Sequence, residues 1–228
     1  MAKTNIYLFA NWKMYLGMAE SEKLSKDLVK FSKKLPKKIK MAVFPSALSS
    51  TAVVKNLKKT PIAVGAQNIY FEDKGGFTGE VSAAMYKDIG SKYALVGHSE
   101  RRHLFHETNH EIRMKMEGAL SIGLMPVLCV GETAQESAYE PVWAISKGLG
   151  VQEQGKHCDA TEANRVHGFI KKTVLALTKD LEPIILFGGS VRPNTAAEYL
   201  KQSNIDGILV GAASTHLDSW KDIVHNAC

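Results

Sequence analysis

The stretch Pro126-Val127-Leu128-Cys129-Val130-Gly131-Glu132 decides the fold of this chain. It runs through apolar residues without interruption and then ends in a glycine and a charged residue. An apolar run with no polar alternation is typical of a strand buried on both faces, which is the setting of a parallel sheet. The stretch therefore predicts a parallel β-strand with a polar loop at its carboxyl end.

Apolar runs of the same kind recur along all 228 residues and alternate with helical patterns. The other runs are Ile6–Phe9, Met41–Phe44, Ile62–Val64, Tyr93–Val96, Ile184–Phe187 and Ile208–Val210. Amphipathic helices are predicted over Glu20–Phe31, Thr108–Ile122 and Glu162–Leu177. Repeated strand–helix units predict a βα barrel or a doubly wound sheet. No linker divides the chain, so we expect one domain over residues 1–228.

Polar or glycine-containing clusters follow almost every apolar run. They are Asn11–Lys13, Gly65–Asn68, Gly97–Arg102, Gly131–Glu132, Gly188–Ser190 and Gly211–Ala212. In a parallel sheet these clusters gather at the carboxyl ends of the strands, where βα barrels build their active sites. An open sheet would concentrate its chemistry at one switch point instead. The spread of the clusters therefore favours a barrel.

The composition argues against several classes of protein. Apolar residues make up 45% of the chain, which is enough for a substantial core. No apolar run reaches the roughly 18 residues that a membrane span needs. The residues Met1–Asn5 enter a strand directly and lack the apolar centre of a signal peptide. The 3 cysteines are odd in number and widely spaced, which indicates reduced thiols. We expect a cytoplasmic protein without membrane association.

The net charge of +6 comes largely from lysines near Pro36 and at the end of a later helix. No aromatic residues interleave with them, so a solvated helix surface is favoured over a nucleic-acid site. The chain lacks a glycine-rich nucleotide loop. His103, His106 and His110 have no thiol or carboxylate partners at metal-ligand spacing. We expect no nucleic-acid partner, no cofactor and no metal.

Seven motifs, taken in order, resemble those of the triosephosphate isomerase family. They are Ala10–Met14, Gly65–Asn68, Gly97–Arg102, Cys129–Glu132, Ala138–Ile145, Gly188–Val191 and Asp206–Gly211. Each motif alone is a weak signal, but their common order and spacing are specific. The resemblance implies a TIM (βα)8 barrel that interconverts dihydroxyacetone phosphate and D-glyceraldehyde 3-phosphate through an enediolate.

The resemblance also implies a role for each of five residues in the reaction. Glu140 would be the base that moves a proton between adjacent carbons, and a neutral His98 would donate a hydrogen bond to the substrate oxygen. Lys13 and Asn11 would stabilise the oxyanion, and Glu100, near the lysine, would have either a supporting or a proton-shuttling role. A carboxylate at the rim of an apolar pocket suits the role of base, because its pKa can be raised toward the working range.

By the same resemblance, the substrate is a small phosphorylated triose whose phosphate is held mainly by backbone N–H groups. Such groups bind anions without side-chain reorganisation. They would belong to Ser146, Ser190, Gly211 and Ala212.

The polar loop Gln67–Glu80 carries several glycines at its tip. A loop of this kind could simply be mobile. In the family the loop inserts into a twin subunit and places the residue matching Thr78 beside the neighbour's lysine. The resemblance therefore implies a homodimer formed through residues 67–80.

The chain departs from the family between Glu132 and Ser137. Only about four residues stand where the family has a helix and the start of a strand, whereas a parallel crossover needs roughly a dozen or more. We therefore expect an incomplete barrel that lacks the helix between strands five and six and most of strand six. The chain would cross the barrel rim to deliver Glu140. Uncovered strands should also lower the stability.

The segment after the expected base departs as well. Ser146–Gly150 differs from the family's pattern, Phe187 replaces a tyrosine, and Ala212 replaces a glycine. These changes bear on lid closure and turnover but leave the substrate class untouched. They keep an alternative open: a barrel of the same fold that binds phosphate but is catalytically impaired.

Overall fold

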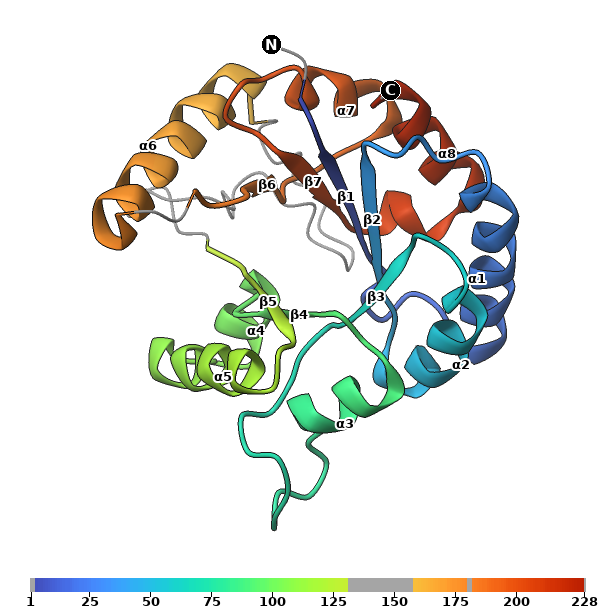
Figure 1. The fold of residues 1–228 in the computed structure, drawn as a ribbon, viewed down its shortest axis with the longest axis vertical. Coiled ribbons are helices and arrows are strands. Elements are labelled where there is room, and N and C mark those ends of the chain that lie inside the picture. Colours follow the sequence, from blue (N-terminus) through green and yellow to red (C-terminus); the bar gives the residue numbers. More distant parts are fainter. Residues whose placement is uncertain (1–2, 131–157, 180–181, 228) are drawn as a thin grey trace. The chain divides into compact units, whose positions relative to one another are not determined.

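The computed structural model describes residues 3–130, 158–179 and 182–227 (Figure 1). Several predictions concern residues outside these ranges. These predictions concern the path of residues 131–139, the shortened sixth strand of the expected barrel, Glu140 and Ser146.

Among the described residues, the strands are hydrogen-bonded in the order β5-β4-β3-β2-β1-β7-β6. Their bounds are β1 Ile6–Asn11, β2 Ile39–Phe44, β3 Ala63–Ala66, β4 Tyr93–Val96, β5 Met125–Leu128, β6 Leu186–Phe187 and β7 Gly207–Val210. Strands that are consecutive in the sequence are neighbours, except β5 and β6, and β1 also pairs with the last strand, β7; we call this order cyclic. It begins and ends at β5 and β6, the strands on either side of residues 131–157. This is the strand order of a barrel and not of a doubly wound sheet.

Helices follow the strands as the alternating pattern predicts. They are α1 Met18–Ser32, α2 Ala47–Leu57, α3 Ala83–Ile89, α4 Ser99–Leu104, α5 Asn109–Ser121, α6 Ala160–Thr178, α7 Pro193–Leu200 and α8 Leu217–Asn226, with a 3-10 turn, η2, at Ala212–Thr215. The helices predicted over Glu20–Phe31, Thr108–Ile122 and Glu162–Leu177 are confirmed as α1, α5 and α6. None of the helices in the described ranges has the length and apolar character to cross a membrane.

The chain divides into two compact units. The first unit contains Met1–Phe9, Pro36–Lys40 and Gly131–Cys228, and the second unit contains Ala10–Leu35 and Met41–Val130. Each unit is described by itself below.

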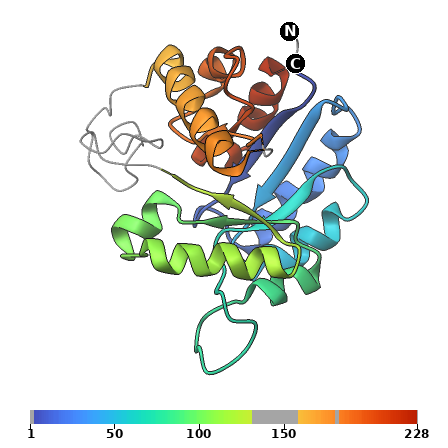
Figure 2. The ribbon, with the colours of Figure 1, turned by 60° about the vertical axis from the view of Figure 1, so that its left-hand side comes forward.

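In the second unit, α3 and α5 bury β3 and β4. The shared core consists of Ala66, Ile69, Ala83, Tyr86, Ala94, Val96, Ile112, Ala119 and Leu124. Local signals fix both helices: the Ser82 side chain accepts a hydrogen bond from Met85 N at the start of α3, and Thr108 forms a capping box with Glu111 at the start of α5. Figure 2 shows α5 running alongside β5.

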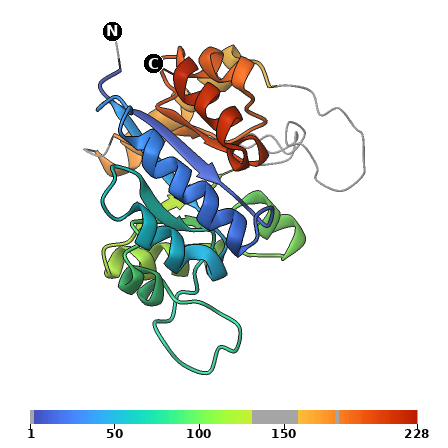
Figure 3. The same cartoon turned by 90° about the vertical axis from the view of Figure 1, so that its right-hand side faces the viewer.

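The helices α1 and α2 lie side by side in the same unit (Figure 3). The buried face of α1 alternates large residues such as Leu24 and Leu28 with the small Ser21 and Ser25. The serines allow a close approach, and Asn56 Nδ2 of α2 donates a hydrogen bond to Ser25 Oγ over 2.9 Å.

In the first unit, Asp206 ties α6 to the strand ends. Its Oδ1 lies 3.0 Å from Lys171 Nζ on α6, and its Oδ2 accepts a hydrogen bond from Ile185 N over 2.8 Å. Next to it, Gly207 leaves no room for a side chain, because a Cβ there would lie 2.0 Å from Tyr7 O. This close approach explains why β7 begins with a glycine.

The strand β5 differs from its neighbour in exposure. Its Met125 and Leu128 side chains are 58% and 44% exposed, and Val130, just beyond the strand, is 37% exposed. These exposures are expected of an uncovered strand, whereas the lower stability stays a prediction.

Candidate active site

The first polar cluster forms a tight turn at the end of β1. Asn11 is buried, and its Oδ1 accepts a hydrogen bond from Lys13 N over 3.0 Å. Lys13 has a φ of +48°, a left-handed conformation that costs a non-glycine residue about 1–2 kcal/mol. Such strain persists only where the surroundings hold the residue in place.

Gln67 supplies that restraint. Its Nε2 donates to Lys13 O over 2.8 Å and to Phe44 O over 2.9 Å. One amide therefore connects the ends of β1, β2 and β3. Sequence reasoning placed Gln67 in a motif but gave it no role. The sequence signal that could have indicated a role for Gln67 is a polar side chain directly after a buried strand.

The turn aims Lys13 at the end of β4. Lys13 Nζ lies 2.7 Å from Glu100 Oε1, and the two side chains are 19% and 44% exposed. A partly exposed pair contributes little to stability, typically about 0–1 kcal/mol. Its value here is positional, because it holds a cation at Glu100, whose other carboxylate oxygen lies 3.6 Å from His98 Nδ1.

His98 follows β4 and occupies the residue before the first turn of α4. It is 8% exposed, and its Nδ1 accepts a hydrogen bond from Glu100 N over 3.2 Å. A ring nitrogen that accepts cannot carry a proton, so this geometry assigns the neutral tautomer with the proton on Nε2. Glu100 Oε2 lies 3.6 Å from Nδ1, beyond hydrogen-bond distance. The free donor of His98 is therefore Nε2–H.

A buried ionic network supports the loop behind His98. Glu107 is 8% exposed; its Oε2 accepts from Arg101 Nε over 2.9 Å, and its Oε1 pairs with the 5% exposed Lys115. Lys115 Nζ also donates to Asn68 Oδ1 over 2.8 Å. Lys115 and Glu107 belong to none of the sequence motifs. A lysine on the buried stripe of α5, between Ile112 and Ala119, was the available signal.

The residues expected to bind phosphate that fall in the described ranges lie in the first unit. Ser190 follows β6, while Gly211 and Ala212 follow β7 and lead into η2. Gly189 is required beside Ser190, because a Cβ there would lie 2.5 Å from the Phe187 ring. These residues occupy strand ends, as the sequence predicts.

Thr78 is exposed in the long loop after β3, and this loop extends away from the helices of its own unit in Figures 2 and 3. Tyr70 anchors the base of this loop against Phe71 and Phe77, with ring centroids 4.3 and 4.6 Å away.

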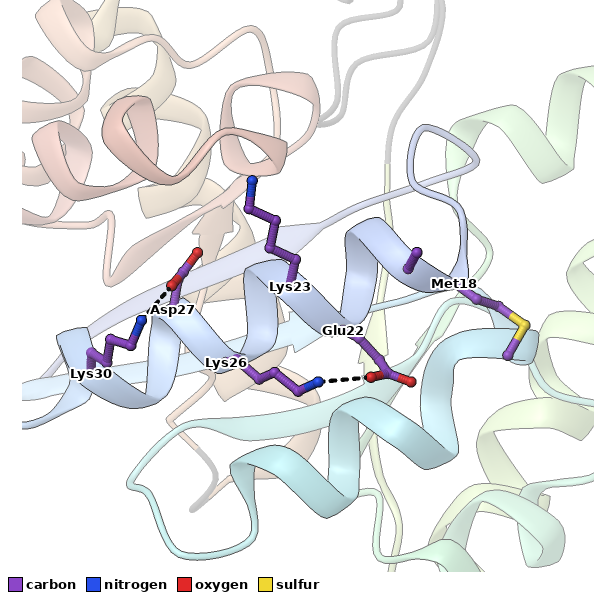
Figure 4. A pocket seen from close by; sticks show the side chains of 7 residues that line it. Met18, Glu22, Lys23, Lys26, Asp27 and Lys30 are labelled. Carbon is purple, nitrogen blue, oxygen red and sulfur yellow. Dashed lines mark hydrogen bonds and ion pairs between the residues drawn. The ribbon is translucent and has the colours of Figure 1, made fainter.

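A shallow groove runs along the exposed face of α1 (Figure 4). Its described lining consists of Met18, Ala19, Glu22, Lys23, Lys26, Asp27 and Lys30. Lys26 pairs with Glu22 over 3.0 Å, and Lys30 pairs with Asp27 over 3.1 Å. All of this lining comes from one helix, so no groups from different elements converge there. The strand ends remain the candidate site.

Comparison with known proteins gives a consistent result. The sequence profile of the family described as triosephosphate isomerase matches residues 6–138 and 137–227. The two matches meet in the stretch where the spacing indicates a missing helix. A triosephosphate isomerase of Dictyoglomus thermophilum is 38% identical, with 94% of this chain and 96% of the relative aligned. Those of a Nostoc species and of Trichodesmium erythraeum are 34% and 35% identical, with 96% and 94% of this chain and 98% and 96% of the relatives aligned.

Proposed function

Because the chain belongs to the triosephosphate isomerase family and is therefore an intramolecular aldose–ketose isomerase, we propose that it interconverts dihydroxyacetone phosphate and D-glyceraldehyde 3-phosphate through an enediolate. Its fold is an incomplete TIM barrel, in line with the cyclic strand order and the family match.

The observation that carries this proposal is the pair of contacts that Glu100 makes with the two strand-end residues: its Oε1 lies 2.7 Å from Lys13 Nζ, and its Oε2 lies 3.6 Å from His98 Nδ1. When the substrate carbon next to the carbonyl loses a proton, negative charge develops on the carbonyl oxygen. His98 Nε2–H donates a hydrogen bond to that oxygen, while the Lys13 ammonium stabilises the same charge. Asn11 holds the lysine turn and can also donate to the oxygen. Fixed donors of this kind need no reorganisation during the reaction.

Glu140 is the proposed base. Its carboxylate takes the proton from the carbon next to the carbonyl and returns it to the former carbonyl carbon. The hydroxyl proton of the enediolate passes to the former carbonyl oxygen, so that a new carbonyl forms on the neighbouring carbon and no atom is gained or lost. Glu100 keeps Lys13 in place during both steps. The substrate phosphate is bound through backbone N–H groups of Ser146, Ser190, Gly211 and Ala212.

The proposal extends to the assembly and the compartment. One barrel domain over residues 1–228 would form a homodimer in the cytoplasm through the loop 67–80. Two exposed apolar side chains of the second unit support a partner surface: Met14, directly after Lys13, is 96% exposed, and Leu48, at the start of α2, is 80% exposed. Sedimentation of the wild type and of Thr78→Arg tests the dimer. A dimeric wild type and a monomeric variant are expected, and a monomeric wild type would contradict the proposal.

Isomerisation measured in both directions tests the function itself. Wild type should turn over both trioses, and Glu140→Ala should reduce kcat by about 10²–10⁴-fold, the usual contribution of a general base. If wild type and Glu140→Ala share the same background rate, the alternative of a catalytically impaired barrel is correct. No observation on the described residues favours that alternative.

A further inference from the structure

We propose that Arg102 is a positioning residue for the reaction, one that fixes the strand end carrying His98 to the strand end from which the chain runs to Glu140. This inference rests on the proposed function, since it assigns Arg102 the alignment of the electrophile with the base.

The contacts of the guanidinium define the role. Arg102 Nε donates to Gly97 O over 2.7 Å, and Nη2 donates to Cys129 O over 3.2 Å. Nη1 donates to Asn109 Oδ1 over 2.7 Å on the outer side. Gly97 directly precedes His98. One rigid fork therefore bridges the carbonyls at the ends of β4 and β5.

These bonds begin where the backbone pairing ends. The strands β4 and β5 are in register up to Val96 and Leu128, and the hydrogen bond from Cys129 N to Val96 O follows over 2.8 Å. Beyond that bond, Arg102 continues the connection through the carbonyl of Cys129. The side chain thus extends the pairing of two strands by one residue on each.

Gly97 is shaped to admit this side chain. Its φ of +70° lies in the left-handed region, which favours glycine. A Cβ at this position would also lie 2.9 Å from Arg102 Nη2 and 2.8 Å from Ile112 Cδ1. The left-handed φ by itself favours a glycine before His98, and the guanidinium occupies space that a side chain there would enter.

The short connection after β5 makes this bridge important. Glu140 stands 11 positions after Cys129 in the sequence. A short connection has less chain in which to absorb a displacement at its origin than a complete crossover would have. A shift of Cys129 relative to Gly97 would therefore move the origin of that connection relative to His98. A misplacement of about 1 Å can lower a rate by about 10²-fold.

The test compares Arg102→Gln and Arg102→Lys with the matched control Asn109→Ala, which removes the outer partner and keeps both carbonyl bonds. We expect Arg102→Gln to lower kcat by about 10²-fold while KM changes by less than about threefold, because the phosphate contacts lie elsewhere. Arg102→Lys should recover part of kcat, since an ammonium can reach one carbonyl but does not reproduce the planar fork. Asn109→Ala should stay within about threefold of wild type.

Chemical rescue separates positioning from folding. Guanidinium chloride at millimolar concentration, far below denaturing levels, should raise the kcat of Arg102→Ala by at least about fivefold. The inference is overturned if Arg102→Gln keeps kcat within about twofold, or if its loss follows a loss of folded protein and neither lysine nor guanidinium restores it.

Amide hydrogen exchange provides a readout without turnover. The Cys129 amide should exchange about tenfold faster in Arg102→Gln, whereas the Leu124 amide, bonded to Ala119 O over 2.9 Å, should keep its wild-type rate. An inactive wild type would refute the proposed function, and these exchange rates would still decide whether Arg102 fixes Cys129. Equal exchange of Cys129 in both proteins would refute that role.

Discussion

The strands β4 and β5 are neighbours of 4 residues each, paired in register, yet their environments differ. In β4, Ala94, Leu95 and Val96 are at most 1% exposed. In β5, Met125 and Leu128 are 58% and 44% exposed, and among the described residues β4 is the only strand paired with β5. Both strands are continuous apolar runs in the sequence. An apolar run therefore identifies a strand, but its burial depends on what the rest of the chain places against it.

The difference extends to the chemistry at the two strand ends. The end of β4 carries His98, whose ring is buried and fixed by a backbone hydrogen bond. The end of β5 leads toward Glu140, the proposed base. The proposed electrophile thus follows a buried strand, whereas the proposed base lies beyond a partly exposed one. Substitutions in both strands test this contrast.

The largest effect is expected at the end of β4. His98→Asn should lower kcat by about 10³-fold, near 4 kcal/mol of transition-state stabilisation, because it removes a preorganised donor to the developing oxyanion. Steady-state kinetics measure this loss. The exposed His103→Asn serves as the control and should match wild type; a loss in both variants would point to unfolding instead.

Burial itself is tested by one truncation in each strand. Leu95→Ala should lower the free energy of unfolding by about 3 kcal/mol, because the residue is 1% exposed and leaves a cavity. Leu128→Ala, at a residue that is 44% exposed, should cost less than about 1 kcal/mol. Denaturant unfolding measures both values. Equal costs would show that β5 is covered in solution.

The difference between buried and exposed positions also affects the pKa of ionisable side chains. His167 in α6 is 0% exposed, and burial lowers its pKa from 6.5 to about 4. At a pH between the two pKa values, His167 is protonated in the unfolded chain but neutral in the folded chain. The free energy of unfolding therefore falls as the pH decreases from about 6.5, and it levels off below about pH 4. At pH 5 the loss relative to pH 7 should be about 2 kcal/mol.

Unfolding curves between pH 7 and pH 5 measure this loss. His167→Leu should abolish that part of the pH dependence, whereas His103→Leu, at an exposed position, should retain it. An unchanged slope in His167→Leu would assign the acid sensitivity to another group.

The smallest effect is expected at the most exposed position of β5. Met125→Thr should change the free energy of unfolding by less than about 0.5 kcal/mol, because a 58% exposed side chain has little burial to lose and threonine is favourable in strands. Thermal unfolding measures it. A loss near 2 kcal/mol would mean that Met125 is packed against something in solution.

Much of the fold was predictable because local patterns encode local structure. The apolar runs located every described strand, although β3 begins at Ala63 rather than at Ile62 and β6 is reduced to Leu186–Phe187. Thr108 marked the start of α5 because its hydroxyl satisfies a free backbone N–H. The bounds shifted by a few residues, since pairing with a neighbouring strand decides where regular structure ends.

The site was predictable only as a set of residues. Motifs placed Asn11, Lys13, His98 and Glu100 at strand ends, but the roles of Gln67 and Arg102 were not read from the sequence. Both side chains act by donating to backbone carbonyls of residues that are distant in the sequence. A carbonyl has no sequence signature, so such contacts cannot be inferred before the strands are paired.

By itself, the sequence determined the alternation of strands and helices, the family, and the shortened stretch between Glu132 and Ser137. The tertiary structure decided which of these elements meet. Lys13 and Glu100 are 87 positions apart and lie 2.7 Å from each other, the tautomer of His98 follows from a single N–H, and β5 is exposed although its composition is that of a buried strand. The physical reason is that hydrogen-bond partners and burial are properties of neighbours in space, which the local pattern of a chain does not specify.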